Sequence, residues 1–293
     1  MANFLLFITT VIIWGATWYA IGFQLGEIDP GVSLAYRYAI AAVIALAWCV
    51  LTRRSLRFGL RAHGYFLLLG LFLFGFNYLS AYHAQLYISS ALNAIGFSAM
   101  IWMNIVNARL FFGARISRST VSGATLGMAG VVIIFVPEVN EVSFSDQVVI
   151  GAGFSLLGAL IASFGNMVSV SAQGRGIPVM QANAWGMTYG ALLNFGLSVA
   201  QGKRFDFDYS FAYMTSLLFL AVFGSVVAFG CYLTLLGRIG AQRAGYAAVM
   251  VPVVAVLFSV LLEGMPLTAT MVAGMALAVT GNVFILATSK TDS

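Results

Sequence analysis

Amide and thioether side chains at helical spacing mark a candidate binding surface in this chain. In the apolar segment 89–108, Asn93, Phe97, Met100, Asn104 and Asn107 recur every three or four residues and form one stripe on a helix. Amides that face lipid are costly, so the stripe must face other helices or an aqueous cavity. Hydrogen bonding between helices explains one Asn easily and three less easily. The pattern therefore favours a cavity with Asn93, Met100 and Asn104 on its wall.

Aromatic side chains with a polar group occur in several other apolar segments. They suit a ligand that is part apolar and part polar. The alternative is that Trp and Tyr near segment ends lie at the membrane–water interface. That explanation is weaker for Trp14, Tyr78 and Trp185. The residues that we expect to join the stripe in a binding site are Trp14, Tyr78, Tyr82, Asn166 and Trp185.

Two further residues are unusual for their surroundings. Arg37 is the only charged residue that we place inside an apolar segment, about two turns from one end of 30–51. It could reach the interface along its alkyl stem, or it could bind a carboxylate. Pro252 is the only proline deep inside a segment, where it removes a backbone hydrogen bond and kinks the helix. The kink could be a hinge or a fixed feature of shape.

Several kinds of chemistry are missing from the pattern. No Asp or Glu lies inside an apolar segment, which argues against a carboxylate proton relay. The chain has no Walker loop for ATP and no His/Cys/Asp set for hydrolysis. Its two cysteines and two histidines lack metal-ligand spacing. We therefore expect no cofactor, no metal and no enzymatic activity.

The composition places these residues in a membrane. Of 293 residues, 61% are hydrophobic and 8% charged, and the mean hydropathy is +0.97, whereas a soluble domain carries about 25% charged residues. So little charge cannot cover a surface in water. The net charge of +5 could suggest nucleic acid, but the basic residues lie in short loops between apolar segments. The expected partner is the lipid bilayer, not nucleic acid.

The segments define an all-α integral membrane protein. A transmembrane helix needs about 20 mostly apolar residues. The first segment lacks a basic leader region and is expected to be a retained helix and not a signal peptide. Ten segments are predicted to span the membrane: 4–22, 30–51, 64–83, 89–108, 118–136, 148–170, 181–200, 211–235, 243–262 and 267–287.

The second half of the chain repeats the first. Residues 246–286 align without a gap on 95–135, at a shift of 151 positions. The division is a first repeat, 1–137, an outer linker, 138–147, and a second repeat, 148–293. Because each repeat has five spans, an odd number, the two are predicted to be inverted around a central cavity. The shared pairs include Leu110/Leu261, Gly113/Gly264, Gly123/Gly274, Leu126/Leu277 and Gly130/Gly281.

The loop charges predict the orientation. With the N-terminus inside, the outer loops contain only two basic residues, Lys203 and Arg204. Such asymmetry follows the positive-inside rule. Both termini are therefore predicted to be cytoplasmic, in a multi-pass protein of a bacterial inner membrane. The inner basic residues are Arg53, Arg54, Arg57, Arg61, Arg109, Arg115, Arg118, Arg175, Arg238, Arg243 and Lys290.

The duplicated segments, together with Arg37 and Pro252, resemble the EamA repeat of the drug/metabolite transporter superfamily. The resemblance covers nearly the whole chain, as two tandem units. The first unit departs from the pattern, with Ile101 in place of Pro252 and Phe112 in place of Glu263. Within the superfamily the chain is most similar to the YddG-type exporters, for which aromatic amino acids are the best-known substrates. The residues that carry the resemblance are Trp14-Gly15, Arg37, Pro252, Leu262-Glu263-Gly264, Gly274 and Gly281.

The resemblance implies a basket-like fold of ten helices, with a cavity lined mainly by 64–83, 89–108, 211–235 and 243–262. It implies a secondary transporter that exports small amphipathic metabolites by alternating access, with aromatic and other neutral L-amino acids foremost. The aromatic candidates would line the substrate's apolar part, and the asparagines would bind its charged groups. The alternatives are a multidrug or other metabolite exporter of the superfamily, or a channel. A monomer is geometrically sufficient, and a zwitterionic substrate predicts weak or no proton coupling.

Overall fold

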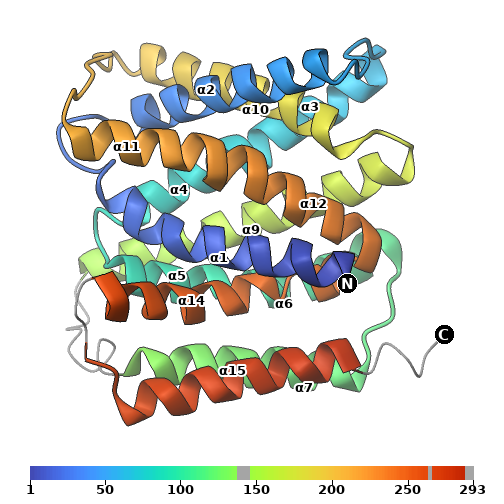
Figure 1. The fold of residues 1–293 in the computed structure, drawn as a ribbon, viewed down its shortest axis with the longest axis vertical. Helices are drawn as coiled ribbons and strands as arrows, with labels where there is room; N and C mark the ends of the chain where they lie inside the picture. The colour runs from blue at the N-terminus through green and yellow to red at the C-terminus, as the bar shows by residue number, and fades with distance from the viewer. Residues whose placement is uncertain (137–145, 263–265, 288–293) are drawn as a thin grey trace.

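The computed structural model describes residues 1–136, 146–262 and 266–287, and every element of secondary structure within those ranges is helical. The helices run roughly parallel or antiparallel to one another across the view of Figure 1. They are α1 (Ala2–Gly22), α2 (Pro30–Leu51), α3 (Leu60–Leu71), η1 (Phe72–Phe76), α4 (Asn77–Ala84), α5 (Ser90–Ser98), α6 (Met100–Phe112), α7 (Arg118–Ile134), α9 (Asp146–Gly174), α10 (Val179–Ala200), α11 (Phe211–Phe219), η2 (Leu220–Val227), α12 (Ala228–Ile239), α13 (Ala241–Ala244), α14 (Ala247–Leu262) and α15 (Ala269–Ala287).

Each predicted apolar segment lies on helix in the structure. Helix α9 begins at Asp146, two residues before the segment predicted at 148. Most of the predicted linker, residues 138–145, falls outside the described residues, as do Glu263, Gly264 and Lys290.

Seven helical runs within the described chain are long and apolar enough to cross a membrane: Ala2–Gly22, Pro30–Leu51, Leu60–Ala84, Leu92–Phe112, Asp146–Gly174, Phe211–Ile239 and Ala241–Phe258. The apolar helices Arg118–Ile134 and Ala269–Val283 are shorter. Helix α10 has 22 residues but carries the buried amides Gln181, Asn183 and Asn194, which lower its hydropathy. The total of ten spans stays a prediction.

Two long helices contain π-helical segments at related positions. Shifting η1 (Phe72–Phe76) by 151 residues gives 223–227, which is the last part of η2 (Leu220–Val227). Ser225 Oγ donates a hydrogen bond to the Leu220 carbonyl at 2.9 Å and so satisfies a carbonyl within η2. Such π-helical turns occur often at functional sites, because they redirect the side chains of an otherwise regular helix.

Helix α14, which contains Pro252, is hydrogen-bonded to α5 at the backbone carbonyl that the proline leaves without its usual donor. Proline has no N–H to donate to the carbonyl of Ala248, four residues earlier. That carbonyl lies 3.1 Å from Ser98 Oγ and shares the single hydroxyl hydrogen with the Ala94 carbonyl, which lies at 2.9 Å. In the first copy Ile101 replaces the proline, yet the helix is still interrupted at Ala99, between α5 and α6. The interruption therefore does not need a proline, and a hinge at Pro252 stays a prediction.

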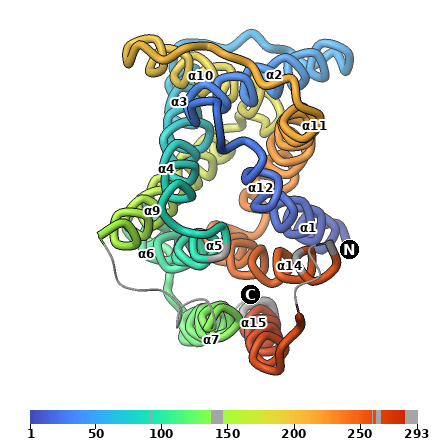
Figure 2. Tube along the Cα trace, turned by 90° about the vertical axis from the view of Figure 1, so that its left-hand side faces the viewer, coloured from blue at the N-terminus to red at the C-terminus, as the bar shows by residue number. Residues whose placement is uncertain are grey.

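Helices α7 and α15 pack side by side at one end of the molecule, and α2 packs along α10 at the other end (Figures 1 and 2). The α7–α15 contact passes through the duplicated glycines. A Cβ on Gly274 would lie 2.6 Å from the Gly130 carbonyl oxygen, and a Cβ on Gly281 would lie 2.7 Å from the Gly123 carbonyl oxygen. The position along α15 rises as that along α7 falls, so the two helices are antiparallel.

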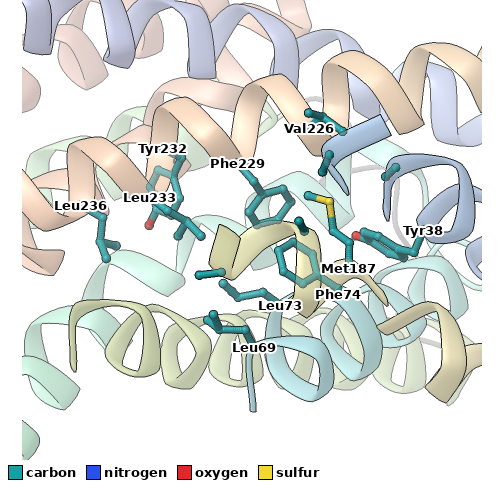
Figure 3. Close-up of a cluster of buried hydrophobic side chains, with 14 of the residues drawn as sticks. Tyr38, Leu69, Leu73, Phe74, Met187, Val226, Phe229, Tyr232, Leu233 and Leu236 are labelled. Atoms are coloured by element: carbon teal, nitrogen blue, oxygen red, sulfur yellow. The ribbon is translucent and has the colours of Figure 1, made fainter. Parts of the chain in front are cut away.

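A buried aromatic cluster joins α2, η1 and α12. The rings of Phe74 and Phe229 meet edge to face at a centroid distance of 5.0 Å, and Tyr38 lies 5.5 Å from Phe74. Figure 3 shows Phe74 and Phe229 next to each other, with Tyr38 and Met187 on the same side. With Met187, the cluster joins α2, η1, α10 and α12 in one buried core.

Candidate functional site

A central cavity of about 80 Å³ lies between α1, η1, α4, α5, α6, α9, α12 and α14. Its wall is mostly aromatic and aliphatic, with a few hydroxyl and amide groups, as in typical small-molecule sites. The lining residues are Trp14, Thr17, Trp18, Ile21, Leu73, Asn77, Tyr78, Ala81, Ala94, Phe97, Met100, Ala162, Asn166, Phe229, Tyr232, Ala248 and Val251.

The lining follows the internal repeat. Positions 151 residues apart both line the cavity in four cases: Tyr78 with Phe229, Ala81 with Tyr232, Phe97 with Ala248, and Met100 with Val251. Equivalent faces of the two copies therefore meet across the same space.

The aromatic wall is held in position by ring contacts and one hydrogen bond. The Trp14 ring lies 5.1 Å from Phe229 and 4.9 Å from Tyr232, and Trp18 lies 5.4 Å from Phe97. Trp14 Nε1 donates to the Gly224 carbonyl at 3.2 Å, which links α1 to η2. These contacts leave flat aromatic faces available to an apolar ligand group.

The polar end of the cavity has unused hydrogen-bonding capacity. Asn166 Nδ2 donates to Tyr232 Oη at 2.9 Å and to Asn104 Oδ1 at 3.2 Å, and Met100 Sδ lies 3.7 Å away. Asn104 Nδ2 and Asn166 Oδ1 are buried and have no hydrogen-bond partner within the described part of the chain. A buried polar group without a partner costs about 1–3 kcal/mol. Asn166 Oδ1 can therefore accept a hydrogen bond from a ligand in the cavity, whereas Asn104 lies behind Asn166 and is not part of the lining.

Arg37 lies on the far side of Tyr78 from the cavity. Its side chain is fully buried, so it does not extend to the interface. Nε donates to Ser225 Oγ at 3.0 Å and Nη1 to Tyr82 Oη at 3.4 Å. The guanidinium carbon lies 4.5 Å from the centroid of the Tyr78 ring and 5.4 Å from that of Tyr38. The charge thus sits among neutral hydroxyls and aromatic rings.

The sequence-predicted residues occupy different places. Trp14, Tyr78, Met100 and Asn166 line the cavity, and Asn104 lies behind Asn166. Tyr82 contacts Arg37 and does not line the cavity. Their roles in binding remain predictions.

Two predicted residues lie elsewhere. Asn93 Nδ2 donates to the Ala81 carbonyl at 2.8 Å, and Ser155 Oγ donates to the Asn93 carbonyl at 3.0 Å, so Asn93 joins helices. Trp185 Nε1 donates to the Leu56 carbonyl at 3.2 Å, and its ring lies 4.8 Å from that of His63, away from the cavity.

Sequence reasoning did not select several of the lining residues, including Phe229 and Tyr232. A signal for two of them was present: Phe229 is the repeat counterpart of Tyr78, and Tyr232 lies one turn further along the same helix. Ser225, which holds Arg37, gave no comparable signal.

Comparison with known proteins agrees with this architecture. A crystal structure shares the fold with a TM-score of 0.82 at 18% identity, covering 99% of both chains. Relatives include the uncharacterized transporter YoaV of Bacillus subtilis, 23% identical over 86% of this chain and 85% of its own length. An uncharacterized transporter of Archaeoglobus fulgidus is 25% identical over 96% and 97% of the two chains. The uncharacterized inner membrane transporter YedA of Escherichia coli is 27% identical over 86% of this chain and 80% of its own.

The family match accounts for both halves of the chain. Residues 1–136 and 149–287 each match the EamA-like transporter family, as two tandem EamA domains. The relatives and the family are transporters, which agrees with the prediction that the protein is not an enzyme. The chain is a multi-pass membrane protein that belongs to the EamA-like transporter family.

Proposed function

We propose that this protein is a secondary transporter that exports small amphipathic metabolites, above all aromatic and other neutral L-amino acids, by alternating access. The observation that carries the proposal is the central cavity, which combines aromatic side chains with the unpartnered amide oxygen of Asn166. An amino acid with an apolar side chain presents both kinds of surface.

The proposed transporter has ten spans in two inverted repeats. The reciprocal glycine contacts support this arrangement, because Gly130 meets Gly274 while their repeat counterparts, Gly281 and Gly123, also meet. In a two-fold relation, each contact is repeated with the two partners exchanged. The four pairs of cavity residues 151 positions apart give independent support. With α7, α10 and α15 as the remaining spans, the loop charges favour two cytoplasmic termini in a bacterial inner membrane.

The size of the cavity supports a moving mechanism. At about 80 Å³, it is smaller than the roughly 300 Å³ at the lower end of ligand pockets. Substrate entry therefore requires the walls to separate. The Ser98–Ala248 hydrogen bond joins α5 of one repeat to α14 of the other, next to Pro252, and is a contact that a rocking motion would strain.

Substrate groups have distinct contacts in this proposal. The apolar side chain lies against Trp14, Tyr78 and Phe229, which the ring contacts hold in place. Asn166 Oδ1 accepts a hydrogen bond from the substrate ammonium, with Asn104 and Tyr232 holding its amide. A zwitterion needs no acidic partner for neutralisation, so transport proceeds with weak or no proton coupling.

A substrate screen in proteoliposomes tests the proposal. We expect saturable counterflow of labelled phenylalanine that continues when no pH gradient is imposed. Competition by neutral amino acids, and not by organic cations, separates this function from multidrug export. Flux that does not saturate would indicate a channel, and an absolute requirement for a proton gradient would refute the uncoupled mechanism.

A further inference from the structure

Arg37 is a cation with no carboxylate partner in the described part of the chain, and its guanidinium packs on Tyr78, a residue of the cavity wall. We infer that Arg37 binds the carboxylate of the transported substrate, so that the carrier selects molecules with a carboxylate and rejects the corresponding amines. This inference rests on the proposed transport function and adds a specificity determinant to it.

The guanidinium group is incompletely satisfied. Its Nη2 is buried and has no hydrogen-bond partner in the structure's described portion. The bond from Nη1 to Tyr82 is 3.4 Å long, beyond the usual N–H···O distance of about 2.7–3.2 Å. Of the two terminal nitrogens, Nη2 is therefore free and Nη1 is only weakly bound. A carboxylate can engage both donors of such a fork at once.

Within the described residues, no carboxylate forms an ion pair with this charge. The ion pairs among the described residues are Lys203 with Asp29 and Arg204 with Asp206, both away from Arg37. Tyrosine rings at 4.5 and 5.4 Å hold the cation by its attraction to their faces and leave it charged. A buried charge in a membrane protein that lacks a partner points to a ligand-binding role.

The free nitrogen lies near the cavity, beside a position where the chain has no side chain. A Cβ on Gly224 would lie 3.4 Å from Arg37 Nη2 and 2.9 Å from Cγ2 of Thr17, which lines the cavity. Thr17 and the guanidinium therefore both pack close to Gly224, where a larger side chain would crowd them. The π-helical segment η2 and the hydrogen bond from Trp14 to the Gly224 carbonyl hold Gly224 in this position.

The geometry also orients the substrate. When the walls separate, a carboxylate that binds Nη2 places the attached apolar group against Trp14 and Tyr78, on the cavity side. The same site lacks a fixed negative charge for a lone ammonium. An arylalkyl carboxylate or amino acid therefore fits, and an arylalkyl amine does not.

Counterflow of labelled phenylalanine with matched competitors tests the inference. Phenylalanine and 3-phenylpropanoate carry the carboxylate, whereas phenylalaninamide and phenethylamine carry the same ring without it. For the wild-type protein, we expect the carboxylate-free pair to inhibit at least about ten-fold more weakly, because hydrogen bonds to a charged group contribute more than neutral ones. In Arg37→Gln, we expect this difference to fall to about two-fold or less, with a comparable rise in the KM for phenylalanine.

Two further variants separate binding from a structural role of Arg37. Gly224→Ala keeps the arginine and places a methyl group against Thr17 Cγ2 and beside Arg37 Nη2, where it hinders a bound carboxylate, so it should reduce the preference for carboxylates. Gly230→Ala is the matched control on the same helix, because its Cβ would meet only Met180 Sδ at 3.6 Å, an ordinary contact. If Arg37→Gln does not fold, Gly224→Ala still decides the question.

The outcomes distinguish the two proposals. Saturable phenylalanine transport with no preference for carboxylates in the wild type would overturn the role of Arg37 alone. An unchanged preference in folded Arg37→Gln, or in Gly224→Ala, would overturn it as well. Absence of saturable transport of any substrate by the wild-type protein would instead overturn the proposed function, and with it the basis for this inference.

Discussion

Replacing Gly130 by Ala should lower the free energy of unfolding by about 2 kcal/mol. The new Cβ would lie 2.5 Å from the Ala278 nitrogen and 2.6 Å from the Gly274 carbonyl oxygen. Both are backbone atoms of α15, so no rotamer change relieves the contact and the helices must separate. Such overpacking costs about 1–3 kcal/mol. We take the upper value because of the backbone contact, and subtract about 1 kcal/mol for the better helix propensity of Ala.

Thermal unfolding in detergent measures this effect. A loss of about 2 kcal/mol corresponds to a fall in Tm of roughly 4–8 °C. Gly153→Ala is the control, since nothing lies within 4 Å of its Cβ; it should be neutral or slightly stabilising. Gly274→Ala should match Gly130→Ala, because the two glycines meet each other. A Tm for Gly130→Ala equal to or above that of Gly153→Ala would refute the account of close helix contact.

Three other changes test the site and its supports. Asn166→Ala should raise the KM for phenylalanine about five- to ten-fold, because it removes a buried hydrogen-bonding group from the cavity wall; an unchanged KM in proteoliposomes would remove Asn166 from the site. Trp185→Phe should leave that KM within about two-fold and lower Tm slightly, since Trp185 bonds the Leu56 carbonyl away from the cavity. Ser98→Ala should cost about 1 kcal/mol, because the Ala248 carbonyl loses its donor. In a Pro252→Ala protein, the backbone N–H of residue 252 can donate to the Ala248 carbonyl, so Ser98→Ala should lower Tm less there than in the wild type. Equal losses of Tm in both proteins would contradict this coupling.

Helix positions could be predicted because they depend on local composition. A run of about 20 apolar residues is long enough to span a bilayer and can satisfy its backbone only as a helix. The predicted segments accordingly lie on helix, including 211–235 within the run Phe211–Ile239. The stripe on 89–108 could be predicted because it too depends on local spacing. Of its residues, Met100 lines the cavity and Asn104 lies behind Asn166.

The site could be predicted only in part, because the direction in which each side chain faces depends on how the helices pack. Trp185 and Trp14 looked equivalent in sequence, yet Trp14 lines the cavity and Trp185 contacts His63 and Leu56. Nothing local distinguishes them. Asn93 shares the stripe with Met100, but the interruption at Ala99 and the carbonyl of Ala81 draw it into a contact between helices.

The sequence by itself determined that the chain is helical, belongs in a membrane and consists of two related halves, because these properties follow from composition and from the shift of 151 positions. It also indicated that Arg37 is a charge in an apolar setting. Only the tertiary structure decided what surrounds that charge: Tyr78, Tyr82 and Ser225 come from two other helices, and Nη2 has no hydrogen-bond partner among the described residues. Contacts of this kind depend on the rotation and spacing of distant helices, which no local pattern of residues specifies.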